Sequence, residues 1–113
     1  MVRSFDNYPV EISKELSAAV EALDDGNEGK ARVCARRAVG KAYAIAAVGH
    51  PASTNTNAPA VLATIMETRD YPPEVRAAAR RLATSVASEE KNEISRHPVE
   101  DAGIIIGFLI GSI

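Results

Sequence analysis

The C-terminal run of this chain, from Pro98 to Ile113, constrains the fold more than any other segment. It begins with a proline and two acidic residues that suit the first turn of a helix, and then runs uncharged over residues 102–113. Gly103, Gly107 and Gly111 recur every fourth residue and therefore share one stripe of that helix. Apolar side chains elsewhere and a bare glycine stripe predict a helix that is surrounded by protein. We therefore expect the rest of the fold to be arranged so that this helix is covered.

The same run is too short for a membrane span. Residues 102–113 fall well below the roughly 20 residues that a bilayer-spanning helix needs. The polar N-terminus lacks the apolar core of a signal peptide. Cys34 is the single cysteine, which excludes an internal disulfide and fits a reducing compartment. We expect a cytoplasmic protein, and the net charge of −2 argues against one that coats nucleic acid through bulk electrostatics.

Apolar spacing along the rest of the chain is helical throughout. No segment shows the alternation of a half-buried strand, so the fold class is all-α. At 113 residues we expect one domain, a compact bundle of four to five helices preceded by an irregular arm over residues 1–8. The expected helices span residues 9–24, 28–48, 58–68, 73–87 and 98–113.

The first two expected helices carry opposite charges. Residues 9–28 hold six acidic residues and one lysine, and residues 30–41 hold five basic residues and no acid. The turn at Gly26 and Asn27 is short, so the two helices form an antiparallel αα-hairpin with the opposite charges facing each other. Each exposed pair contributes well under about 1 kcal/mol. Burial of the C-terminal helix against this hairpin must therefore supply most of the stability.

The basic residues of the second helix have two interpretations. They could contact phosphates of RNA or of a nucleotide, or they could pair with the acidic helix and otherwise lie in water. No aromatic residue is interleaved to stack on a base, as single-strand binders require. The candidate phosphate contacts are Arg32, Arg36, Arg37 and Lys41, with Arg96 from the segment before the last helix.

A second candidate site lies in the polar segment before the apolar helix. It contains Lys91, Asn92 and His97. Histidine can act as base or acid near neutral pH, and a neighbouring cation can stabilise a phosphate in a transition state. The alternative is that Ser95 or His97 simply caps the following helix. Two histidines and one cysteine cannot form a four-ligand zinc site without carboxylates, and no nucleotide-binding glycine motif is present, so we expect no metal and no cofactor.

The layout resembles the HEPN superfamily of small helical-bundle proteins. The resemblance rests on an acidic helix ending at residues 24–27, a long alanine-rich helix over residues 31–43, and a basic-amide-to-histidine motif before a closing apolar helix. The family's signature is an arginine, often followed by asparagine, with four to six residues in all before a histidine. Lys91, Asn92 and His97 match that spacing, with lysine in the place of arginine.

This resemblance implies metal-independent RNA cleavage at a dimer interface, with His97 as the acid–base group, Asn92 as its polar companion and Lys91 in the arginine position. Lysine supplies one point charge where arginine supplies a planar, two-pronged donor. We therefore expect a non-catalytic or weakly active, RNA-associated HEPN-like protein. Gly103, Gly107 and Gly111 would line the homodimer interface.

Residues 61–82 resemble one HEAT-type helical hairpin, in which an aspartate and an arginine brace the turn. No second copy is evident, although a solenoid needs about three repeats. The resemblance implies the alternative function, a helical-hairpin scaffold that binds a protein partner. The residues that match the pattern are Asp70, Pro73, Val75, Arg76, Ala79 and Leu82.

Overall fold

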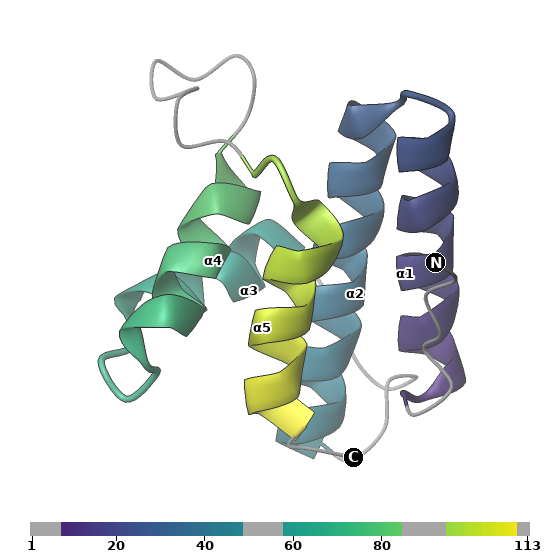
Figure 1. The fold of residues 1–113 in the computed structure, drawn as a ribbon. Helices are drawn as coiled ribbons and strands as arrows, with labels where there is room; N and C mark the ends of the chain where they lie inside the picture. The colour runs from purple at the N-terminus through teal and green to yellow at the C-terminus, as the bar shows by residue number, and fades with distance from the viewer. Residues whose placement is uncertain (1–7, 49–57, 85–94, 111–113) are drawn as a thin grey trace.

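The computed structural model describes residues 8–48, 58–84 and 95–110, and within these ranges every regular element is an α-helix. The all-α class and the compact bundle are thereby confirmed, and Figure 1 shows α5 lying between α4 and α2. Of the expected arm over residues 1–8, residues 1–7 lie outside the described residues. The helices are α1 (Val10–Asp24), α2 (Glu28–Val48), α3 (Ala58–Glu67), α4 (Pro73–Ala83) and α5 (Pro98–Ile110).

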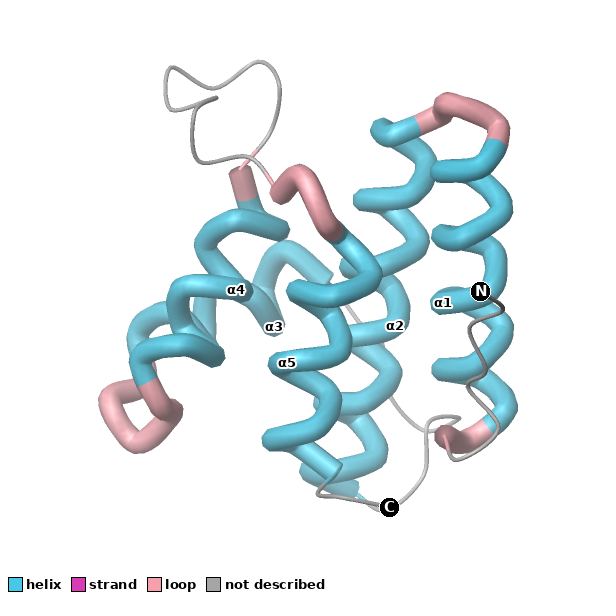
Figure 2. The backbone as a smooth tube through the Cα atoms, viewed as in Figure 1, coloured by secondary structure: helices cyan, strands magenta, loops and turns pink. Residues whose placement is uncertain are grey.

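The antiparallel hairpin of α1 and α2 forms as the charges and the turn predict (Figure 2). Gly26 has φ +77°, a conformation that side chains other than glycine rarely adopt. Asn27 accepts a hydrogen bond from the Lys30 N–H at its Oδ1, 3.1 Å away, and so caps the start of α2. Lys41 and Glu15 join the two helices at 2.8 Å. This pair confirms the expected facing of basic and acidic residues.

The core is centred on α2, which packs against α1, α3 and α5. Its buried positions are largely alanines such as Ala35, Ala38 and Ala42, and these let the neighbouring helices approach closely. Cys34 is buried beside Ala31, as a small packing residue in the expected inward position. The largest fully buried apolar side chains come from four other helices and are Ile12, Leu16, Leu62, Ile65, Leu82, Ile105 and Ile106.

The α3–α4 hairpin is held at its turn by Arg76, whose Nε donates to the Tyr71 carbonyl at 3.0 Å. The end of α4 differs from the expectation, which placed it near residue 87. The helix ends at Ala83, because Thr84 adopts an extended conformation with ψ 131°. The carbonyls of Leu82 and Thr84 accept hydrogen bonds from Arg36 of α2. A side chain distant in the sequence thus satisfies the end of this helix.

One copy of the chain covers α5 on one side only, and the prediction that a second copy covers the glycine stripe stays a prediction. Ile105 and Ile106 are fully buried, but Ile104 and Phe108 remain 40% and 47% exposed. A Cβ placed on Gly103 or Gly107 would meet no atom within 4 Å. The physical reason is that α2 and α4 occupy only one side of α5. Gly111 lies outside the described residues.

Candidate functional site

A partly buried polar cluster joins the end of α4 to the beginning of α5. Arg81 holds the Asp101 carboxylate with two nitrogens, Nη2 at 2.7 Å and Nε at 3.1 Å. The Ser95 hydroxyl donates to the same carboxylate at 2.6 Å, and both Ser95 and Asp101 are buried. The hydrogen bond with Asp101 raises the pKa of Arg81 above its usual value. We call Arg81, Ser95 and Asp101 the junction clamp.

Two of the predicted phosphate contacts bind backbone carbonyls around this clamp. Arg36 donates to Leu82 and Thr84, and Arg32 donates from Nη1 to the Ser95 carbonyl at 3.4 Å. Burial, with the neighbouring charge of Arg32 as a second cause, lowers the pKa of Arg36. Cations beside the carbonyls that end a helix stabilise that end. Arg36 therefore fastens the end of α4 to α2, and Arg32 fastens Ser95 to the same helix.

The three remaining candidate phosphate contacts are distributed over different parts of the surface. Lys41 pairs with Glu15 between α1 and α2, as the alternative interpretation expected. Arg37 on α2 and Arg96 before α5 are exposed. The structure therefore does not gather the five candidates on one surface, and a phosphate contact at Arg37 or Arg96 stays a prediction.

The candidate acid–base residue His97 lies at the N-terminus of α5. Its side chain is 75% exposed, and its Nδ1 is 3.8 Å from the Glu100 carboxylate. Its backbone carbonyl accepts a hydrogen bond from the Asp101 N–H at 2.9 Å, so His97 occupies the position that begins the helix. Lys91 and Asn92 lie outside the described residues. A catalytic role for these three residues stays a prediction.

The exposed side of α5 combines large apolar side chains with bare backbone. Ile104 and Phe108 form a ridge one helical turn long, and Gly103 and Gly107 form a shallow groove beside it. None of these four residues is charged or polar. We call Gly103, Ile104, Gly107 and Phe108 the α5 face.

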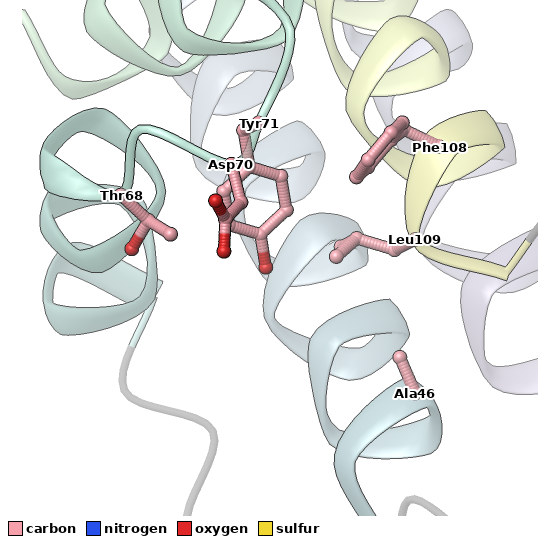
Figure 3. Close-up of a pocket in the computed structure, with 6 residues that line it drawn as sticks. All are labelled: Ala46, Thr68, Asp70, Tyr71, Phe108 and Leu109. Atoms are coloured by element: carbon pink, nitrogen blue, oxygen red, sulfur yellow. The ribbon is translucent and has the colours of Figure 1, made fainter.

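A cavity of about 310 Å³ opens at one edge of the α5 face, where the α3–α4 turn approaches the end of α5 (Figure 3). The rings of Tyr71 and Phe108 meet there edge to face, with centroids 5.3 Å apart. Burial, with Tyr43 as a second cause, raises the pKa of Tyr71 above its usual value. The lining residues are Ala46, Thr68, Asp70, Tyr71, Phe108 and Leu109.

Sequence reasoning missed the junction clamp and the cavity. A signal for the clamp was present, because Asp101 begins an otherwise apolar helix and a buried carboxylate requires a cation or hydrogen-bond donors. Nothing in the sequence names Arg81 as that cation rather than one of its arginine neighbours. The signal for the cavity was weaker, since Tyr71 and Phe108 are 37 positions apart and only the tertiary fold brings their rings together.

Comparison of the chain with family models, with curated proteins and with solved structures found no match. Within the described ranges, no group of three or more histidine, cysteine, aspartate or glutamate residues is arranged to hold a metal ion. None of the helices described has both the length and the apolar character needed to cross a membrane. The function must therefore be argued from the α5 face, the junction clamp and the cavity themselves.

Proposed function

We propose that this chain is a non-catalytic interaction module that pairs with a second copy of itself through the α5 face. The observation that carries the proposal is the exposure of Ile104 and Phe108 beside two glycines with open space above them. Large apolar side chains and bare backbone at one surface are typical of a helix that receives another helix closely. The module would be built from the bundle, with α5 as its contact element.

The shape of the α5 face favours a second copy over an unrelated partner. A ridge and a groove lie side by side on the same helix, so the ridge of one copy can enter the groove of the other when two copies meet about a twofold axis. The face carries no charge, and two identical uncharged surfaces meet without the repulsion that identical charged surfaces would suffer. Self-pairing therefore needs no change in the described side chains.

Electrostatics favours an antiparallel arrangement of the two α5 helices. Glu100 lies one turn before the α5 face and is exposed. A parallel pair would bring the two Glu100 carboxylates together and align the two helix dipoles, whereas an antiparallel pair separates the carboxylates and opposes the dipoles. Antiparallel pairing centred on the glycines would separate the two His97 residues by about 24 Å, at about 1.5 Å per residue along the helix. Such a dimer cannot form a shared His97 site, which is the reason for proposing a non-catalytic module.

The affinity of the pair should be modest. Stable interfaces bury about 800 Å² on each partner, and one side of a 13-residue helix, about 20 Å long, offers less than that. We expect a dissociation constant in the micromolar range.

Sedimentation velocity over a concentration series tests the pairing, with Ile104→Glu as the disrupting variant. Val33→Glu is the matched control, because Val33 on α2 is 41% exposed and Ile104 is 40% exposed. The wild type and Val33→Glu should both form dimers as the concentration rises from about 1 to about 500 µM, and Ile104→Glu should remain monomeric. A wild type that stays monomeric over this range, or an Ile104→Glu variant that still pairs, would contradict the proposal.

Disulfide formation between engineered cysteines tests the orientation. In the antiparallel pair, two copies of Ile104→Cys lie near the twofold axis and should cross-link. Two copies of Glu100→Cys lie about 15 Å apart along the axis, beyond the roughly 7 Å that a disulfide can bridge. Efficient cross-linking of Glu100→Cys would show a parallel pair and would restore the possibility of a shared His97 site.

A HEPN-like role on RNA is the second candidate function, and the accessibility of the His97 side chain supports it. The test compares RNA cleavage by the wild type and by His97→Ala, with Arg37→Ala and Arg96→Ala measured for RNA binding at low salt. Cleavage that requires His97 would establish the nuclease role. Absence of both cleavage and binding would remove it.

A further inference from the structure

The cavity between the α3–α4 turn and α5 combines a carboxylate with aromatic walls. Figure 3 shows Thr68, Asp70 and Tyr71 on one side, with Phe108 and Leu109 across from them and Ala46 of α2 below. Its volume of about 310 Å³ lies at the lower end of the range typical of small-molecule sites, about 300–1,000 Å³. The polar side and the apolar side together suit a molecule that is itself polar at one end.

Among the described residues that line the cavity, Asp70 is the only charged one. Among the residues that the structure describes, none forms an ion pair or a hydrogen bond with its carboxylate. Arg76, which the HEAT-type pattern would place with Asp70 as a brace, donates instead to the Tyr71 carbonyl. Asp70 therefore lines the cavity without a described ion-pair partner, and neither Arg69 nor Arg76 is among the lining residues.

The two rings add to the attraction for a cation. Tyr71 and Phe108 both line the cavity, and their ring planes meet at an angle of 61°. The face of an aromatic ring attracts ammonium groups within about 6 Å of its centre. The Tyr71 phenol is protonated at neutral pH, since the usual pKa of a phenol is already about 10 and burial raises the pKa of Tyr71 further, so the phenol adds no competing negative charge.

We infer that this cavity binds a small organic ammonium ion, with the ammonium group at Asp70 and Tyr71 and an apolar substituent against Phe108 and Leu109. An anion is disfavoured by Asp70, and a purely apolar molecule would leave the polar side of the cavity without partners. Because Asp70 is exposed, the ion pair is screened by water, and binding in the millimolar range is expected for a small probe.

This inference goes beyond the proposed function and does not depend on it. Asp70 and Thr68 lie on the α3–α4 turn, away from the α5 face, and only Phe108 belongs to both surfaces. Binding is therefore measured in the wild type and in the Ile104→Glu variant as well. Equal binding in the two proteins would show that the cavity acts in a single copy, whatever the outcome for self-pairing.

The test is an NMR titration of the ¹⁵N-labelled protein with benzylammonium chloride, and with benzyl alcohol as the neutral probe of similar shape. Saturable amide shifts at Thr68–Tyr71 and at Phe108 and Leu109 are expected for the ammonium ion below about 50 mM, with binding of the alcohol at least about tenfold weaker. Asp70→Asn should weaken benzylammonium binding by about tenfold or more. Asp25→Asn, an exposed carboxylate at the remote α1–α2 turn, is the matched control and should bind as the wild type does.

Three results would overturn the inference. The first is the absence of saturable shifts at the cavity with benzylammonium. The second is equal binding of benzylammonium and benzyl alcohol, which would show an apolar surface without cation recognition. The third is undiminished binding by Asp70→Asn, with its fold verified by circular dichroism, which would place the cation elsewhere.

Discussion

The inner and outer sides of α5 differ in how completely one copy of the chain satisfies them. On the inner side, Ile105 and Ile106 are fully buried, and Asp101 has both Arg81 and Ser95 as partners. On the outer side, Ile104 and Phe108 lie in the open next to uncovered glycines. The two sides have similar apolar composition, so their difference comes from the placement of the other helices. A largely apolar helix can thus hold a fold together with one side while its other side stays partly exposed.

The largest difference in unfolding free energy should appear between alanine variants of the neighbouring residues Ile105 and Ile104. Ile105→Ala removes a fully buried side chain from the contact with α2 and α4 and should lower the free energy of unfolding by about 3 kcal/mol. Ile104→Ala should lower it by less than about 1 kcal/mol in the monomer, because much of that side chain is already in water. Urea unfolding followed by circular dichroism measures both at low protein concentration. Equal losses of unfolding free energy for the two variants would contradict the distinction between the inner and outer sides of α5.

The next effect should come from the junction clamp. Asp101→Ala leaves the buried Ser95 hydroxyl and the Arg81 guanidinium without their acceptor, and should cost about 2 kcal/mol of unfolding free energy. The expected loss of unfolding free energy is no larger because the Arg81 side chain is 39% exposed, so water can replace part of the lost contact. Glu100→Ala is the adjacent control and should change the unfolding free energy by less than about 0.5 kcal/mol. A larger cost at Glu100 than at Asp101 would contradict the assignment of the clamp.

A smaller effect of opposite sign is expected at Gly107. Gly107→Ala adds a methyl group where there is open space and removes a residue that disfavours helix, so the monomer should become more stable by about 0.5–1 kcal/mol. The same methyl group fills the groove, so self-pairing should weaken. Unfolding at low concentration and sedimentation at high concentration measure the two effects separately. A gain in both stability and pairing would show that the groove is not the contact surface.

The smallest expected effect is on the pH dependence of the free energy of unfolding. It comes from Tyr71, whose ring contacts Phe108 on the outer side of α5. Burial raises the pKa of Tyr71 above the usual value of 10.0, so at alkaline pH the unfolded chain loses this proton before the folded chain does. The group therefore stabilises the fold below about pH 10 and this contribution is lost as the pH rises further. The difference in urea unfolding between the wild type and Tyr71→Phe, measured at about pH 9 and about pH 11, isolates it. A difference that does not change with pH would show that Tyr71 titrates alike in both states.

The sequence predicts the helices well because their signals are local. Pro98 and the acidic residues after it begin α5, and Gly26 lies in the turn that follows α1. Apolar spacing identifies Ile12 and Leu62 as core residues. The end of α4 was predicted too late because the groups that define it, the Arg36 guanidinium and the Leu82 and Thr84 carbonyls, are far apart in the sequence.

The candidate site was harder to predict because its parts are tertiary. The basic residues of α2 have the same pattern whether they bind phosphate or backbone carbonyls. Only the positions of the end of α4 and of Ser95 show that Arg36 and Arg32 bind carbonyls. The glycine spacing indicates which stripe of α5 lacks side chains, but it could not show whether another helix of the same chain covers that stripe. The α3–α4 turn resembles a HEAT-type hairpin in its sequence, yet its aspartate faces a cavity rather than its arginine.

The dependence of the urea unfolding midpoint on protein concentration tests the two-sided account of α5 most directly. If the inner side holds the monomer and the outer side holds a second copy, the wild-type midpoint should rise as the concentration increases about a hundredfold, since association stabilises the folded state by mass action. The midpoint of Ile104→Glu should stay constant over the same range. A wild-type midpoint that does not move with concentration would show that the outer side of α5 contributes nothing through a partner copy.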